Sequence, residues 1–145
     1  MIKTFKPSAE PYQKDPRPAA ARAEASGFEV IWGNSRRITV DLDNGKELND
    51  DVLGILSQLT EFTIKRWTSK SGHGEHVCID TKEFFTVTER AAIQAALGSD
   101  PKREMLALLN TRAVGYTEPF MLFKPIVKLE KDLDEFDVPD GACPF

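Results

Sequence analysis

The chain has 145 residues, of which 41% are hydrophobic and 29% charged, so we expect one globular domain with a single core. No apolar stretch reaches the ~20 residues of a membrane helix, and the first residues lack the apolar segment of a signal peptide. These features predict a cytoplasmic protein without a membrane partner. Two cysteines, Cys78 and Cys143, are too few for a disulfide framework or a zinc cluster. The net charge of −4 at first argues against a nucleic-acid-binding protein.

The acidity is concentrated at the C-terminal end of the sequence. Residues 129–145 hold six acidic residues and one lysine, a net charge of −5, which leaves +1 on the rest of the chain. We therefore expect a flexible or loosely docked N-terminal arm (1–26), rich in proline and alanine, a folded domain (27–128) and an acidic tail (129–145). The folded domain is nearly neutral, so its charge does not exclude a nucleic-acid partner.

The first half of the folded domain alternates between strand and helix patterns. Residues 28–32 and 38–42 alternate apolar with polar positions around a Gly-Asn-Ser turn, which predicts a hairpin. Apolar residues at helical spacing over 48–59 predict a helix, with a capping box from Asn44 and Glu47. Alternation resumes over 62–67, which predicts a further strand.

The second half continues with a strand over 76–80. Thr86 and Glu89 form a capping-box pattern for a helix that ends at Gly98, and Pro101 suits the first position of another helix. A last strand is predicted over 120–127. After the hairpin, this order is the split βαβ pattern of ferredoxin-like and RRM-like α+β folds, with helices on one face of an antiparallel sheet and the other face open.

Two carboxylates are expected on the open face of the sheet, the one that the helices do not cover. Period-two alternation puts Asp41 and Asp43 together, ~6.6 Å apart along the strand, opposite their apolar neighbours. Carboxylates at this spacing can converge on magnesium or manganese, so both are candidate metal ligands and catalytic acids. The alternative is that they only solvate the strand end or cap a helix.

A glycine-containing loop follows the next strand. Glycines there allow backbone N–H groups to approach an anion, and hydroxyls and a lysine add donors. The candidate phosphate-binding residues are Ser69, Lys70, Ser71, Gly72, Gly74 and His76. The alternative is a plain hairpin loop with exposed polar side chains.

Together, Asp41-Leu42-Asp43 and the segment from Ser69 to His76 resemble the motifs of the archaeo-eukaryotic primase superfamily, also called primase-polymerases. The resemblance covers residues 36–127. It implies that Asp41 and Asp43 hold divalent metals and that Ser71 and His76 contact the triphosphate of a nucleotide. That family has a third acid on a later strand. Residues 120–124 contain none, and Asp80 is the candidate substitute.

Basic and aromatic residues near the loop suggest a surface for single strands, on which bases stack. The candidates are Arg36, Arg37, Lys65, Arg66 and Trp67. Alternatively, Trp67 packs beneath the N-terminal arm.

The C-terminal end, with its acids followed by Pro-Phe, resembles the tip of bacterial single-stranded-DNA-binding proteins, which docks replication and repair partners. Here the docking residues would be Asp137, Asp140, Pro144 and Phe145. The terminal phenylalanine would fill an apolar pocket while the acids meet a basic rim. The alternative is a solubilising tail.

We therefore expect a non-enzymatic single-stranded DNA-binding protein of replication, suited to a phage or mobile element, with a primase-like palm and a partner-docking tail. One alternative is a small primase or nucleotidyltransferase that uses magnesium or manganese at Asp41 and Asp43 while His76 and Lys70 neutralise the triphosphate. Another is an interaction module whose acids mimic phosphates.

Overall fold

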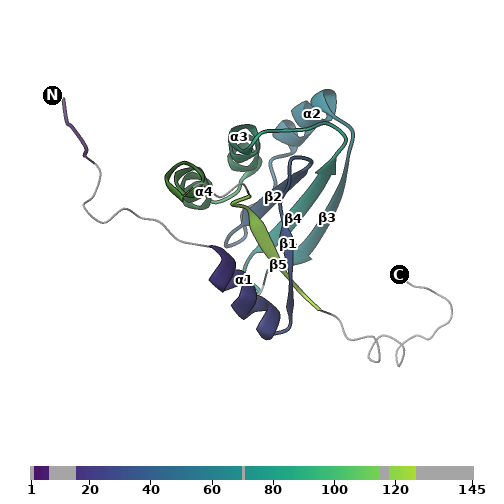
Figure 1. The fold of residues 1–145 in the computed structure, drawn as a ribbon. Coiled ribbons are helices and arrows are strands. Elements are labelled where there is room, and N and C mark those ends of the chain that lie inside the picture. The colour runs from purple at the N-terminus through teal and green to yellow at the C-terminus, as the bar shows by residue number, and fades with distance from the viewer. Residues whose placement is uncertain (1, 7–15, 70, 115–117, 127–145) are drawn as a thin grey trace.

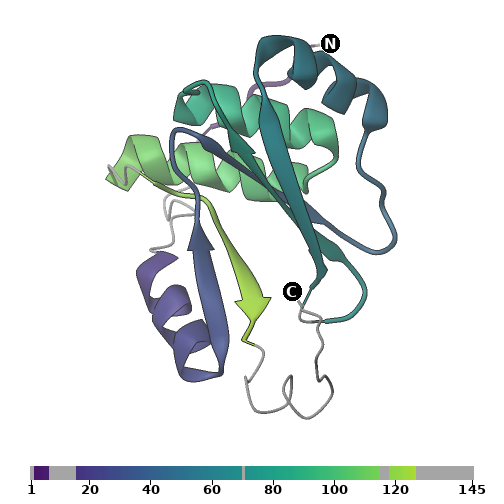
Figure 2. The same ribbon diagram turned by 90° about the vertical axis from the view of Figure 1, so that its right-hand side faces the viewer.

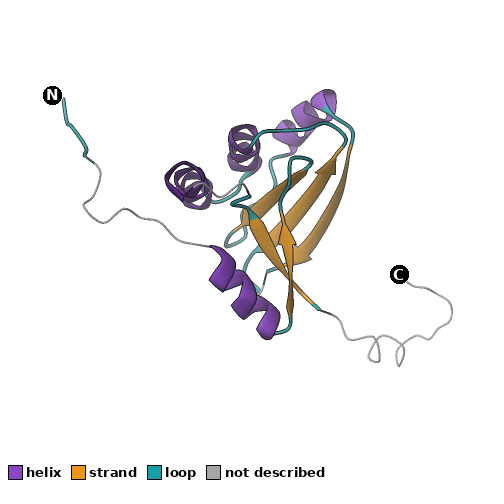
Figure 3. Cartoon of the chain, in the orientation of Figure 1, coloured by secondary structure: helices purple, strands orange, loops and turns teal. Residues whose placement is uncertain are grey.

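The computed structural model describes residues 2–6, 16–69, 71–114 and 118–126 (Figure 1). The elements follow in the order α1 (Pro16–Ala25), β1 (Phe28–Trp32), β2 (Arg37–Leu42), α2 (Asp50–Leu59), β3 (Phe62–Thr68), β4 (Glu75–Thr81), α3 (Val87–Leu97), α4 (Pro101–Val114) and β5 (Met121–Pro125). Within these residues, the helices and two antiparallel sheets form an α+β fold, as predicted (Figure 3). No helix in the described ranges is long and apolar enough to cross a bilayer.

The larger sheet has the strand order β2-β4-β3, which is the neighbour relation expected of a split βαβ unit. Ile38 lies opposite Ile79 and Val40 opposite Val77, so the apolar side chains of β2 and β4 share one face. α2 and α3 cover that face (Figure 1). The buried core there consists of Ile38, Val40, Leu42, Leu48, Leu56, Val77, Ile79 and Leu97.

The helix ends show where local sequence signals hold. Thr86 accepts a hydrogen bond from the Glu89 backbone and the Glu89 side chain accepts one in return, so the predicted capping box of α3 is confirmed. Gly98 ends α3 at φ 119°, a left-handed conformation that favours glycine. The predicted cap of α2 is wrong, because its N-cap is Asn49, while Asn44 lies in the turn after β2.

Side chains from α3 and α4 cap the outer edge of β2. The Thr39 N–H donates to Oε1 of Gln94 (2.9 Å), and Nη1 of Arg103 donates to the Thr39 carbonyl (3.0 Å). Gln94 is fully buried and donates through Nε2 to Glu104 (2.7 Å), whose other oxygen accepts from Arg103 (2.6 Å). These side chains satisfy backbone groups that a neighbouring strand would otherwise pair. The last strand therefore does not extend this edge.

β1 and β5 instead form a separate two-stranded ribbon. The predicted hairpin between residues 28–32 and 38–42 is wrong, because β1 pairs with β5 along its whole length, from Phe28 opposite Pro125 to Trp32 opposite Met121. The ribbon lies beside the face of the larger sheet that points away from α2 and α3 (Figures 1 and 2).

α1 packs on β1, on the outer side of the ribbon (Figure 2). It buries Ala20 and Ala23. Residues 16–25 therefore differ from the flexible arm expected over 1–26, because the alanine-rich run gives a helix a narrow face that can pack against a strand. Residues 7–15 lie outside the described ranges.

Candidate functional site

Asp41 on β2 and His76 on β4 are direct cross-strand partners, on the face that alternation predicted. Nε2 of His76 lies 3.4 Å from Oδ1 of Asp41, and Nδ1 lies 3.0 Å from the carbonyl oxygen of Phe123 on β5. Because a carbonyl oxygen only accepts, Nδ1 carries a proton and donates it. The hydrogen bond from His76 lowers the pKa of Asp41, burial opposes this, and the charge of Arg103 lowers the pKa further. Asp41 is therefore held as a carboxylate against the imidazole.

Asp43 follows the end of β2 and is exposed. Partial desolvation raises its pKa, and the negative charges of Asp41 and Asp100 raise it further. Asp100 thus belongs to the same group of acids, a role that sequence reasoning missed. The Asp100-Pro101 pair indicated only a helix start, and the Asp100 side chain does accept from the Lys102 N–H (3.0 Å). Nothing in the spacing along the chain placed this helix start beside β2.

The junction between α3 and α4 is fixed to the backbone of Asp41. The Asp41 N–H donates to the buried Ser99 hydroxyl (3.1 Å), and the Asp100 N–H donates to the Asp41 carbonyl (3.3 Å). In the described ranges, however, no three His, Cys, Asp or Glu side chains converge closely enough to hold a metal ion. Binding of magnesium or manganese by Asp41 and Asp43 stays a prediction, and no chemical step is derived from it.

The glycine loop between β3 and β4 closes against the end of β2. A Cβ atom at Gly74 would collide with the carbonyl oxygen of Leu42, so this position requires glycine. Gly72 has φ 79°, which other residues rarely adopt. The Asp41–Asp43 motif and the Ser69–His76 motif therefore meet at one end of the sheet. This agrees with the prediction that β2 and β4 are neighbouring strands.

Backbone N–H groups of this loop donate to its own serines. The Gly74 N–H donates to the Ser69 hydroxyl (3.1 Å) and the His73 N–H to the Ser71 hydroxyl (3.2 Å), with the two hydroxyl oxygens 3.1 Å apart. The serine oxygens thus occupy acceptor positions that a phosphate oxygen would take. Lys70, the predicted cation of the loop, lies outside the described residues.

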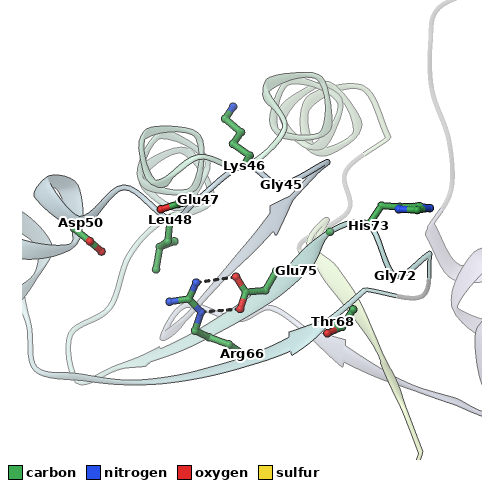
Figure 4. Close-up of a pocket in the computed structure, with 11 residues that line it drawn as sticks. Gly45, Lys46, Glu47, Leu48, Asp50, Arg66, Thr68, Gly72, His73 and Glu75 are labelled. Carbon is green, nitrogen blue, oxygen red and sulfur yellow. Dashed lines mark hydrogen bonds and ion pairs between the residues drawn. The ribbon is translucent and has the colours of Figure 1, made fainter.

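A polar pocket of about 450 Å³ lies on the α2 side of the glycine loop (Figure 4). Its lining residues are Gly45, Lys46, Glu47, Leu48, Asp50, Arg66, Thr68, Gly72, His73, Gly74 and Glu75. Arg66 and Glu75 lie side by side in its lining and form a bidentate ion pair of 2.7 and 2.8 Å. Lys46, which the sequence did not single out, is close enough to Asp43 to act on its pKa. The positively charged Lys46 in the pocket lining therefore lies near the acidic residues at the end of β2.

Trp67 on β3 is half-buried under the ribbon. Its Nε1 donates to the carbonyl oxygen of Phe123 (2.9 Å), and its ring lies edge-on to the His76 imidazole, with centroids 5.9 Å apart. Nζ of Lys124 lies 5.4 Å from the Trp67 ring centroid. The indole therefore contacts the chain itself, although its partner is β5 and not the N-terminal arm.

The face expected to be open is covered over β2 and β4. Thr39 and Cys78 on this face are buried. Burial raises the pKa of the Cys78 thiol, while the charges of Lys65, which is opposite Cys78 on β3, and Lys124 lower it. The open part is β3, where Thr63 and Lys65 are exposed. The physical reason is the separate β1–β5 ribbon, which the sequence pattern did not reveal.

The sequence predicted a basic strip of Arg36, Arg37, Lys65, Arg66 and Lys70, with Trp67 as its aromatic neighbour. The prediction that these residues form one continuous strip is wrong. Arg66 alternates with Trp67 and points to the opposite, α2 side of the sheet. Arg37 is paired with Asp80 (2.8 Å) at the end of the sheet remote from His76, so Asp80 is not the substitute acid. Lys65 and Trp67 do share a face, as predicted.

No protein-family model, curated protein or solved structure matches this chain. The likeness to primases therefore rests on the two motifs, and the site is argued from its own geometry. The predicted docking residues of the tail, Asp137, Asp140, Pro144 and Phe145, lie outside the described ranges.

Proposed function

We propose that the protein binds single-stranded DNA along β3 and that a nucleotide phosphate contacts the adjoining glycine loop. The observation that carries this proposal is the 3.4 Å contact between His76 and Asp41, because it joins two sequence motifs from different strands at one end of the sheet. The primase-like resemblance assigns nucleotide chemistry to both motifs. Nothing in the local sequence of either motif requires the two to meet, so their contact supports a shared role.

Single-strand contact is supported by the side chains on the open part of the sheet. Lys65 is exposed on the same side as Trp67, and Lys124 approaches the indole from β5. Lysines neutralise backbone phosphates and an aromatic ring offers a stacking surface to any base. The contact therefore suits a single strand of any sequence.

Phosphate contact is supported by Lys46, which lines the pocket beside the glycine loop, and it requires the N–H groups of His73 and Gly74 to exchange their serine acceptors for phosphate oxygens. The nearby carboxylates of Asp41, Asp43 and Asp100 would repel a bare phosphate. A divalent cation between phosphate and carboxylates would remove that repulsion. This observation favours a second candidate function, metal-dependent nucleotidyl transfer, over the protein-interaction module.

Binding is tested by fluorescence anisotropy of a labelled 12-mer of thymidine, single-stranded and in a duplex, over a range of salt concentrations. We expect preference for the single strand, and a salt slope that falls by about one phosphate contact in Lys65→Ala. Arg112→Ala, an exposed arginine on α4, is the matched control and should keep the wild-type slope. Equal slopes in all three proteins would overturn the proposal.

Catalysis is tested by primer synthesis from labelled nucleotides with manganese. The binding-only function predicts no product. Product that disappears in Asp41→Ala and in Asp43→Ala would instead establish the transferase.

We also propose that the tail docks a replication protein in the cytoplasm, on its sequence alone. Removal of residues 137–145 should abolish capture of that partner and keep or raise DNA affinity. Lower DNA affinity after removal would contradict a separate docking role.

A further inference from the structure

Phe84, in the loop between β4 and α3, is 70% exposed. The guanidinium of Arg36 lies over its ring, 5.2 Å from the centroid. Arg36 is itself held in place, because its Nε donates to the carbonyl of Thr81 (3.3 Å). An aromatic ring with a positioned guanidinium is a stacking surface for an unpaired base.

Hydrogen bonds of the residues before and after Phe84 fix the loop so that the Phe84 ring points into solvent. Before it, the Lys82 N–H donates to the Glu61 carbonyl (2.9 Å) and the Glu83 N–H to the Thr60 hydroxyl (3.0 Å). After it, the Phe85 N–H donates to a carbonyl in the β1–β2 turn (2.7 Å), and the Phe85 ring packs on the core. The backbone is therefore anchored around an exposed ring, which cannot turn inward without breaking these bonds.

This ring lies beyond the other end of β3 from Trp67. Thr63 is four residues before Trp67 on the same face, ~13 Å along the strand, and is paired with Asp80. Asp80 in turn lines a hollow of about 280 Å³ with Arg36. The charge of Asp80 is balanced by Arg37, 2.8 Å away. The row of Trp67, Lys65 and Thr63 thus ends beside the hollow that Arg36, the partner of Phe84, helps to line.

We infer that Phe84, backed by Arg36, is a second base-stacking position for single-stranded nucleic acid, so that a bound strand is held at both ends of β3. This inference rests on the proposed function and adds to it a minimum length for a strand that occupies both stacking positions. The ~13 Å between Trp67 and Thr63 corresponds to about four base steps at ~3.4 Å each, and Phe84 lies beyond Thr63, so a stacked strand needs more than about five nucleotides to reach both positions. A thymidine 12-mer reaches both positions, whereas a 4-mer, with three such steps, occupies one.

The test compares the affinity of labelled thymidine 4-mers and 12-mers for three variants. Phe84→Leu keeps an apolar side chain but removes the ring, Phe84→Trp restores a ring, and Met105→Ala alters an exposed apolar residue on α4. We expect Phe84→Leu to weaken 12-mer binding about 5- to 150-fold and to leave 4-mer binding at Trp67 unchanged. Phe84→Trp should bind the 12-mer like wild type, with its fluorescence quenched.

The outcomes separate this inference from the function on which it rests. Unchanged 12-mer affinity in Phe84→Leu, with normal binding by wild type, overturns the second stacking position alone. Equal loss for the 4-mer and 12-mer in that variant also overturns it, because Phe84 would then belong to the first position. Absence of binding by wild type overturns both the inference and the proposed function. Equal loss in Met105→Ala would mean that apolar surface, not an aromatic ring, sets the affinity, which contradicts the inference.

Discussion

His76 and Trp67, cross-strand partners on β4 and β3, both donate to one atom, the carbonyl oxygen of Phe123. Two neighbouring strands thereby hold the β1–β5 ribbon against the larger sheet. Both residues were expected to contact ligand, and both also stabilise the fold. Substitutions at either position must therefore be judged by stability as well as by binding.

The first prediction separates these two roles of Trp67. Trp67→Phe keeps a stacking ring but removes the donor to Phe123, so we expect a loss of about 0.5–1.5 kcal/mol in the free energy of unfolding. Its single-strand affinity should stay near wild type, whereas Trp67→Ala should lose both. Urea unfolding measures the free energy of unfolding of each variant, and fluorescence anisotropy on the same samples measures its affinity for single-stranded DNA. If Trp67→Ala bound DNA normally, the indole would not be a stacking surface.

The second prediction concerns the capped edge of β2. Gln94→Leu leaves the Thr39 N–H without its acceptor and Glu104 without its Nε2 donor in a fully buried site. Unsatisfied buried polar groups each cost about 1–3 kcal/mol, so the free energy of unfolding should fall by about 2–4 kcal/mol. Gln58→Ala, on the exposed surface of α2, should change it by less than about 0.5 kcal/mol. Similar stability of the two variants would show that the edge is satisfied in another way.

The third prediction contrasts two glycines. Gly74→Ala brings a Cβ against the Leu42 carbonyl, so the loop must shift, at a cost of about 1–3 kcal/mol. Gly54 lies in α2, and a Cβ added there would meet nothing within 4 Å, so Gly54→Ala should stabilise by about 0.5–1 kcal/mol. Thermal or urea unfolding shows whether Gly74→Ala lowers and Gly54→Ala raises the stability of the fold. A stable Gly74→Ala variant would refute the close contact between the loop and β2.

The fourth prediction uses the opposite pKa shifts of Asp41 and Asp43. The folded pKa of Asp41 is lowered, so its stabilising contribution is present above its unfolded pKa, about 3.9, and is lost as the pH falls through the lower folded pKa. Asp41→Asn should therefore be less stable than wild type by about 1–2 kcal/mol at pH 6, with a smaller difference near pH 3.

Asp43 has the reverse sign, because its folded pKa is raised by desolvation and by neighbouring acids. Its carboxylate opposes folding above that pKa, so Asp43→Asn should be more stable than wild type at neutral pH and equal to it in acid. Urea unfolding from pH 3 to 7 measures both variants. The same direction of change in both would contradict the charge arrangement at the end of β2.

Signals that act between near neighbours were predictable from the sequence. The capping box of Thr86 and Glu89 and the glycine at position 98 depend on backbone groups within a few residues, so local composition determines them. Alternation likewise placed Asp41 on the face of His76, because side chains of a strand point to opposite faces in turn.

Contacts between distant segments had no such signal. Apolar alternation showed that residues 28–32 form a strand but not that β5, about ninety positions later, pairs with it. The same holds for Asp100, which reaches Asp41 only because Ser99 and Arg103 hold the α3–α4 junction on the edge of β2. Local sequence thus determined α2, α3, α4, the strands and the acidity of residues 129–145, and the order of these elements indicated the strand order of the larger sheet but neither α1 nor the β1–β5 pairing. Tertiary packing alone decided that the ribbon covers most of the open face, because strand pairing depends on complementarity of whole surfaces and not on the residues next in sequence.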